Sequence, residues 1–145
     1  MDPIVDKPLA GVTVVITRPV GYGRALAHRV RVLGGVPVAL PGLSLRPVVE
    51  IDMVRAELKE ALTGSLILFS SPAAVQFAAR LAPLRGSAIF AAVGRGTARA
   101  LRRQGVADPL VPSTTQDAAG LLAHPGLADV RGARVAVSDS CASVL

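Results

Sequence analysis

Residues 87–105, SAIFAAVGRGTARALRRQG, contain the pattern of a strand, a turn and a helix within one short stretch. Residues 88–93 form an unbroken apolar run, which is typical of a strand covered on both faces in a parallel sheet. The glycine-containing turn 94–96 ends this run. Thr97 then begins a helical pattern, and Gly105 is the kind of residue that commonly ends a helix. The stretch therefore predicts an α/β fold with parallel strands.

The turn after this strand has two interpretations. In the first, the glycines let a strand enter a helix tightly and Thr97 caps that helix. In the second, bare amides at the beginning of the helix bind an anion together with Arg95 and the Thr97 hydroxyl. A short glycine pair is a weak motif, so this turn alone favours the structural interpretation. The same order of strand, small polar turn and helix recurs in residues 12–35 and 65–81, which favours a ligand.

The composition predicts a globular chain with one core, because 51% of its 145 residues are hydrophobic. Aromatic residues are scarce: Tyr22, three phenylalanines and no tryptophan. This argues against a stacking platform for single-stranded nucleic acid. The formal net charge of +6 comes from scattered arginines and favours a polyanionic partner. An equally good explanation of the arginine content is the base composition of the source genome.

Few residues could bind a metal or act as catalysts. Cys141 is the only cysteine, which excludes an internal disulfide and a cysteine cluster for a metal. His28 and His124 are far apart in the sequence. The first residues, MDPIVDKPLAG, lack the basic start and apolar core of a signal peptide, and no apolar run is long enough for a membrane span. We therefore expect a cytoplasmic protein.

The first third of the chain predicts two strands joined by a helix. Residues 12–17, VTVVIT, are rich in β-branched residues and predict a buried strand. The helix after Gly23 places an apolar stripe of Leu26, Val30 and Leu33 inward and leaves Arg24, His28 and Arg31 in solvent. Residues 36–40 predict a second strand. Pro41 and Gly42 then break the chain before an extended piece, 43–48, which is a plausible connection between domains.

The next segment predicts a helix capped by Asp52 and ending near Leu62, then a buried strand over residues 65–69. Ser71 fits the N-cap and Pro72 the first position of a helix over residues 73–81. No acid or histidine stands beside Ser71, so a cap is favoured over a nucleophile. A capping hydroxyl and the amides next to it can still hold a carboxylate.

The last segment predicts a short strand over residues 109–111 and a helix over 116–123, for which 113–115 offer several caps. We expect His124 to be a cation at the end of that helix or a residue facing solvent. Residues 134–137 predict the last strand. The tail 138–145, SDSCASVL, has neither a glycine turn nor helical periodicity, so the chain is expected to stop before its architecture is finished.

Several motifs in order resemble one family. They are LAGVTVVITRP near the start, GGVPVALP, LILFSSPAAV, AAVGRGTARALRRQG, and DAAGLLAHPGL followed by GARVAV. Their order and spacing, from about residue 9 to 137, are similar to uroporphyrinogen-III synthase. That enzyme closes the linear tetrapyrrole hydroxymethylbilane with inversion of ring D and loss of water.

The resemblance implies a flavodoxin-like α/β architecture of two similar domains with the substrate between them. It implies a lyase of haem biosynthesis that is monomeric, needs no cofactor or metal, and binds neither nucleic acid nor membrane. Substrate carboxylates would be held by backbone amides and hydroxyls at strand ends. The matching positions are Arg18, Ser70, Ser71, Ala73, Gly94, Arg95 and Thr97. No residue is assigned to proton transfer.

The resemblance also implies that the first domain is discontinuous. Residues 1–42 would be its strand-helix-strand piece, and residues 43–145 most of the second domain without its C-terminal part. The family's later tyrosine has no counterpart, and Tyr22 cannot replace it. A frameshift or truncation would explain the tail and would impair activity. Two alternatives stay open: a non-catalytic flavodoxin-like module that binds a small anion or a partner protein, and a marginally folded product without function.

Overall fold

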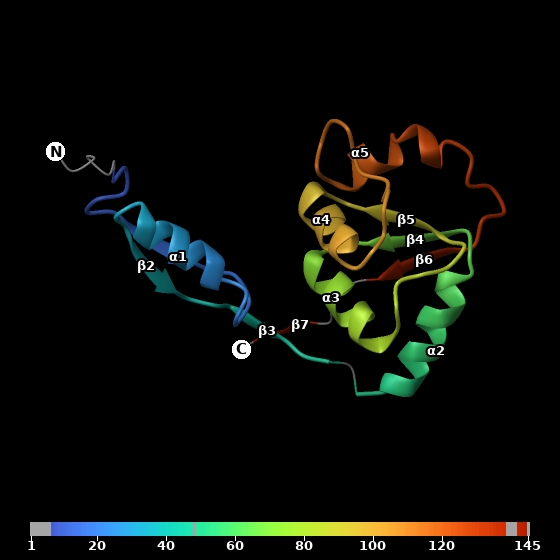
Figure 1. The fold of residues 1–145 in the computed structure, drawn as a ribbon, viewed down its shortest axis with the longest axis horizontal. Coiled ribbons are helices and arrows are strands. Elements are labelled where there is room, and N and C mark those ends of the chain that lie inside the picture. The colour runs from blue at the N-terminus through green and yellow to red at the C-terminus, as the bar shows by residue number, and fades with distance from the viewer. Residues whose placement is uncertain (1–6, 48, 139–141, 145) are drawn as a thin grey trace. The chain divides into compact units, whose positions relative to one another are not determined.

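The computed structural model describes residues 7–47, 49–138 and 142–144 (Figure 1). The chain divides into two compact units, and we describe each by itself. Unit 1 comprises Met1–Arg46 with Cys141–Leu145, and unit 2 comprises Pro47–Ser140. Cys141 lies outside the described residues. The assignment of residues 1–42 and 43–145 to the two domains of the family stays a prediction.

Unit 1 is built from a strand, a helix and a second strand. β1 (Thr13–Ile16) and β2 (Val36–Ala39) pair in parallel, and α1 (Arg24–Val32) connects them. The helix lies close to the strands because Gly35 has no side chain: a Cβ there would come within 2.9 Å of Val30 Cγ1. β3 (Leu43–Leu45) pairs with β7 (Ala142–Val144) in antiparallel orientation. The tail strand β7 was not predicted from the sequence.

The strand predicted within residues 12–17 is present as β1, but the prediction that it is buried is wrong. Ile16 is buried, but the Val15 side chain is 54% exposed, and its neighbour Val38 is 43% exposed. Among the described residues of unit 1, only α1 packs on the β1–β2 pair, and a single helix covers one face of a sheet. The buried apolar face of α1 is also narrower than predicted, because Leu26 is 41% exposed while Val30 is buried.

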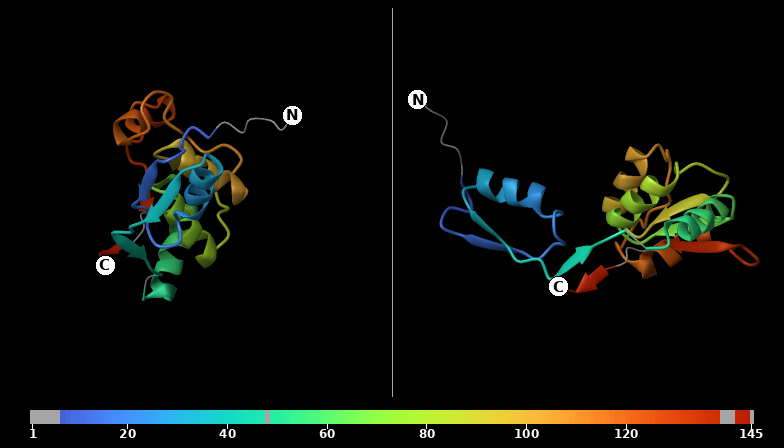
Figure 2. Two further views of the ribbon diagram at one scale, coloured as in Figure 1. Left: turned by 90° about the vertical axis from the view of Figure 1, so that its left-hand side faces the viewer. Right: turned by 90° about the horizontal axis from the view of Figure 1, so that it is seen from below.

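Unit 2 contains a parallel sheet in the order β5-β4-β6. Its strands are β4 (Leu66–Phe69), β5 (Ile89–Ala92) and β6 (Val135–Ser138). The helices are α2 (Ile51–Leu62), α3 (Pro72–Leu81), α4 (Arg95–Arg103), α5 (Ala118–Leu122) and the short 3-10 turn η1 (Pro125–Leu127). The strand expected at 109–111 is reduced to one parallel bridge between Leu110 and Ala91. Figure 2 shows these helices packed around the sheet in two further views.

The core of unit 2 lies on both faces of β4. On one face, Ile67 and Phe69 pack with residues of α2, α3 and α4, and the Phe69 and Phe90 rings stack with centroids 6.3 Å apart. On the other face, Leu66 packs against Leu121 of α5. Alternate residues of a strand point to opposite faces, so the apolar run is buried on both sides. The predicted α/β class, parallel strands flanked by helices, is confirmed.

Local sequence signals located some helix starts correctly and others wrongly. The Ser71 cap is confirmed: its Oγ accepts a hydrogen bond from the Ala74 amide over 3.1 Å, with Pro72 at the first helical position. Asp52 is not a cap, since α2 begins at Ile51 and the Asp52 carboxylate pairs with Arg55 instead. Among the described residues, this ion pair within the first turn is the interaction that the Asp52 carboxylate makes.

Two further predictions about helix ends are wrong. α4 begins at Arg95 after Gly94, which places Thr97 inside the first turn and not at the cap. α5 begins after Asp117, whose Oδ1 accepts from the Gly120 amide over 2.7 Å, so residues 113–115 do not cap it. A carboxylate makes a stronger bond to a backbone amide than a hydroxyl does.

His124, expected to be a cation at the helix end or a residue facing solvent, is partly exposed and lies between α5 and η1. Its Nδ1 atom accepts a hydrogen bond from the Gly126 amide over 3.0 Å. His124 thus acts as the N-cap of η1.

Candidate functional site

The sheet of unit 2 brings two helix N-termini to one edge. β4 and β5 are adjacent and parallel, so their carboxyl ends lie at the same edge, and α3 and α4 follow directly. The two turns are close neighbours: a Cβ added at Gly96 would lie 3.8 Å from Pro72 Cγ. Neither helix has an acidic residue in its first turn. This edge therefore carries the partial positive charge of two helix N-termini.

In α3, one backbone amide of the first turn is left over. Pro72 has no amide hydrogen, and the Ala74 amide donates to Ser71 Oγ. The Ala73 amide has no hydrogen-bond acceptor within the described part of the chain. Ser71 thus acts as a cap and leaves the Ala73 amide available to a ligand. A role of Ala73 in binding substrate stays a prediction.

In α4, the first amide is already occupied. The Arg95 amide donates to Oε1 of Gln116 over 2.6 Å, and the Gln116 amide nitrogen donates to the Pro112 carbonyl over 3.3 Å. The expectation that all amides of this turn are bare is therefore wrong for Arg95. The Gly96 and Thr97 amides have no acceptor among the residues that the structure describes.

The Thr97 residue is only 4% exposed. No hydrogen bond of this hydroxyl occurs within the described residues, and none of their side chains carries a fully buried oxygen or nitrogen without a partner. The hydroxyl is therefore not completely enclosed. The edge thus combines an available hydroxyl with three amides, those of Ala73, Gly96 and Thr97. The Arg95 side chain beside them is exposed.

Ser70 lies where the strand order reverses. β5 and β6 lie on opposite sides of β4, and ligands of open parallel sheets bind in the crevice beyond such a reversal. The Ser70 amide donates to the Ser138 carbonyl over 3.2 Å, and its hydroxyl lies 3.4 Å from the same oxygen. These bonds join the ends of β4 and β6. A role of Ser70 in binding substrate stays a prediction.

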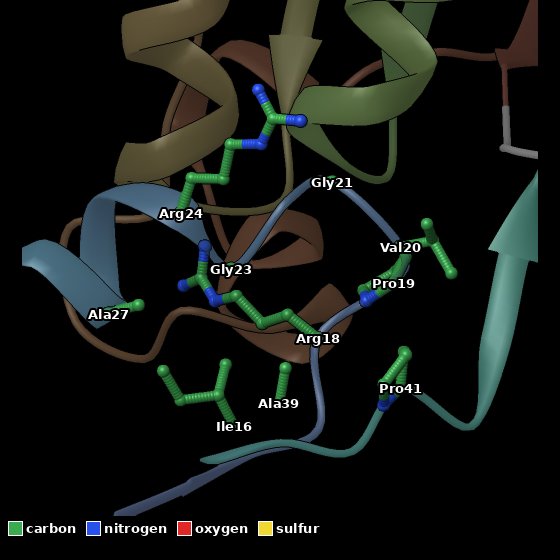
Figure 3. A pocket seen from close by; sticks show the side chains of 10 residues that line it. All are labelled: Ile16, Arg18, Pro19, Val20, Gly21, Gly23, Arg24, Ala27, Ala39 and Pro41. Carbon is green, nitrogen blue, oxygen red and sulfur yellow. The ribbon is translucent and has the colours of Figure 1, made fainter. Parts of the chain in front are cut away.

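Arg18 belongs to unit 1 and lines a pocket of about 270 Å³ there (Figure 3). The pocket lies at the carboxyl ends of β1 and β2, beside the first turn of α1. The structure therefore brings Ser71, Ala73, Gly94, Arg95 and Thr97 together at one edge of unit 2, and Arg18 lines the pocket of unit 1.

Two residues that matter at these edges were missed in the sequence. Gln116 stands 21 positions after Arg95, and no local pattern connects them. Arg24 lines the same pocket as Arg18, but its helical spacing only predicted a solvated position. Within the described residues, no group of three or more histidine, cysteine, aspartate or glutamate side chains could hold a metal ion. No helix in that part of the chain is both long and apolar enough to cross a membrane.

Parallel strands flanked by helices, with the amides of Ala73, Gly96 and Thr97 unpaired among the described residues at one sheet edge, define an α/β protein with two open helix starts. The family model of uroporphyrinogen-III synthase HemD matches residues 24–141, and the chain belongs to this family. A comparison with curated proteins found no match to the chain.

Proposed function

We propose that the chain acts in uroporphyrinogen-III synthesis, closing hydroxymethylbilane to uroporphyrinogen III with inversion of ring D and loss of water. The observation that carries this proposal is the cluster of unpaired amides of Ala73, Gly96 and Thr97 at one sheet edge, in a chain of this family. Backbone amides are good ligands for carboxylates, and the proposed substrate carries many of them.

The reaction does not require a nucleophile from the protein. The pyrrole nitrogen of the substrate can push out the terminal hydroxyl as hydroxide, which leaves an azafulvene cation. Attack by the ring D carbon forms the spiro intermediate, which then rearranges and loses a proton, so that water is released overall. The contribution of the protein is to fold the linear chain and hold ring D against the cation.

Ala73, Gly96 and Thr97 would hold substrate carboxylates in this scheme, with Arg95 beside them and Arg18 in its own unit. We assign no residue as the general acid. The same proposal describes the chain as a cytoplasmic hydro-lyase. It uses no cofactor or metal, and its substrate is a small polycarboxylate.

The test is conversion of freshly generated hydroxymethylbilane, scored as type III isomer over the type I product that forms spontaneously. The chain should raise the type III fraction. Thr97→Val removes the hydroxyl while keeping a similar shape, and it should lower kcat/KM about tenfold. Thr97→Ser, which keeps a hydroxyl, should retain activity, as should the control Thr114→Ala at an exposed position. A folded chain that gives only type I product would refute the proposal.

A second candidate is a non-catalytic flavodoxin-like module that binds a small anion at the same edge. It is favoured by the lack, among the described residues, of a cluster of acidic, histidine or cysteine side chains at the site. Calorimetric titration separates the two: binding of a mononucleotide or sugar phosphate without binding of tetrapyrrole precursors would support the module.

A further inference from the structure

One side of α4 is covered by exposed arginines. We call these four residues the basic face of α4: Arg95, Arg99, Arg102 and Arg103. With 3.6 residues per turn and a rise of 1.5 Å per residue, their positions fall within about 100° of arc and along about 12 Å of the helix. The other side of α4 is buried in unit 2 through Thr97, Ala98 and Leu101. The helix therefore holds four guanidinium groups on one exposed side of the unit.

The basic face of α4 has no counter-ion among the described residues. The ion pairs in that part of the chain are those of Arg55, Arg131 and Arg134. None of the four side chains of the basic face donates a hydrogen bond to another described residue. Residues 61–107, which include β4, α3, β5 and α4, contain no aspartate or glutamate. The helix α3, which packs beside α4, therefore supplies no acid to this face.

The stability of α4 does not explain this arrangement. Arg99 stands four residues after Arg95 and four before Arg103, and like charges at this spacing destabilise a helix. Arg95 is also the first residue of the helix, where the helix dipole disfavours a cation. Base composition can account for the number of arginines in the chain, but not for their alignment on one side of a helix without acids. An external anion would convert the repulsion into attraction.

The acids of unit 2 limit the size of that anion. Unit 2 as a whole is nearly neutral, with ten basic and eight acidic side chains in residues 47–140. Three of the acids belong to α2, which packs on the same face of the sheet as α3 and α4. Proteins that bind nucleic acid through its phosphates make about 6–10 such contacts. The basic face of α4 offers four guanidinium groups, so it fits a short acidic surface better than a long polyanion.

We propose that the basic face of α4 is a docking surface for an acidic α-helix of a partner protein. Carboxylates four residues apart on a helix recur at intervals of about 6 Å, which is also the interval from Arg95 to Arg99 and from Arg99 to Arg103. Each guanidinium can donate two parallel hydrogen bonds to a carboxylate. The proposal does not depend on the proposed function. Because Arg95 also borders the candidate ligand edge, the test uses the other three arginines.

The test is a titration of a labelled, alanine-rich helical peptide with the full chain in about 0.15 M salt, followed by fluorescence anisotropy. The peptide carries a glutamate at every fourth position. A second peptide of the same composition, with its glutamates spread around the helix, should bind more weakly. The triple variant Arg99→Gln, Arg102→Gln and Arg103→Gln should weaken binding of the first peptide about tenfold, since each exposed ion pair contributes modestly.

A matched control removes the same charge from unit 1. The triple variant Arg29→Gln, Arg31→Gln and Arg46→Gln changes three exposed arginines there. It should weaken binding by about twofold at most, because charges farther apart than a Debye length are largely screened. A second readout is the denaturant midpoint. Arg99→Gln should not lower it, because this variant relieves the repulsion along α4.

Four results would overturn the inference. The first is equal binding of the two peptides, or of neither. The second is equal weakening by the unit 1 variant, which would indicate a general field and no contact at α4. The third is tighter binding of a short DNA duplex than of the peptide. The fourth is a lower denaturant midpoint in Arg99→Gln, which would mean that this arginine serves the fold.

Discussion

Gln116 caps the beginning of α4 from outside that helix: its Oε1 atom accepts a hydrogen bond from the Arg95 amide over 2.6 Å. The same side chain donates to the Pro112 carbonyl, so it connects the turn after β5 to the segment before α5. A Cβ at Gly94 would lie 3.3 Å from this oxygen, so the N-cap glycine makes room for it. The bond leaves the Gly96 and Thr97 amides as the ones that a ligand can reach.

Gln116→Ala should lower the free energy of unfolding by about 1 kcal/mol, because it leaves the Arg95 amide without its cap. Urea unfolding of the full chain measures the change. Anion affinity should not fall, since the variant exposes one more amide at the site. The control is Gln104→Ala, an exposed residue at the opposite end of α4 whose side chain makes no hydrogen bond in the described residues. Equal destabilisation by the two variants would contradict the capping role.

Substitutions of Ser71 can separate its role as a helix cap from the binding of a ligand at the same helix start. Ser71→Ala should cost about 1 kcal/mol of stability, because the Ala74 amide loses its acceptor. Ser71→Asp should keep the cap and the stability, but its negative charge lies beside the available Ala73 amide and should repel a carboxylate. Thermal unfolding and binding of the substrate together give both readouts. Undiminished substrate binding by Ser71→Asp would show that no carboxylate sits at this helix start.

The sequence predicted those features that depend on neighbours along the chain. The Ser71 cap, the proline after it and the burial of β4 all follow from local patterns, and all are present. The cap of α4 was missed because the hydrogen-bond partner lies 21 positions away. The burial of β1 was overestimated because an apolar run does not reveal how many layers cover it, and Val15 is 54% exposed. The candidate edge of unit 2 was predicted because parallel strands end together, whereas the pocket of Arg18 and Arg24 depends on spatial proximity.

Because of Asp117, the free energy of unfolding should depend on pH at values below the usual pKa of an aspartate. The Gly120 amide and the Thr115 hydroxyl donate to its carboxylate and lower its pKa from the model-compound value of 3.8. A lowered pKa in the folded state means that the carboxylate stabilises the fold above pH 3.8 and that this stability is lost as the pH falls through the folded-state pKa.

The measurement is the free energy of unfolding of the full chain and of Asp117→Asn, from about pH 6 down to about pH 2. The two curves should converge at the acidic end, since the protonated aspartic acid no longer has its advantage over the amide. Asp129→Asn is the control for a second carboxyl whose pKa is lowered, in that case by Arg131. Curves of wild type and Asp117→Asn that stay parallel over the whole range would exclude the role of Asp117.

Gly86→Ala should destabilise unit 2 by about 1–3 kcal/mol, because the added Cβ would collide with the Leu62 carbonyl oxygen at the end of α2. That oxygen also accepts a hydrogen bond from the Ala88 amide over 3.1 Å, so it cannot move away without weakening the start of β5. Gly42→Ala is the matched control, since a Cβ there has nothing within 4 Å and the backbone is not in the left-handed region. Denaturant midpoints measure both. Because the clash is with backbone and not with a flexible side chain, relaxation should recover only part of the lost stability. An unchanged denaturant midpoint in Gly86→Ala would mean that α2 and β5 do not approach each other in this way.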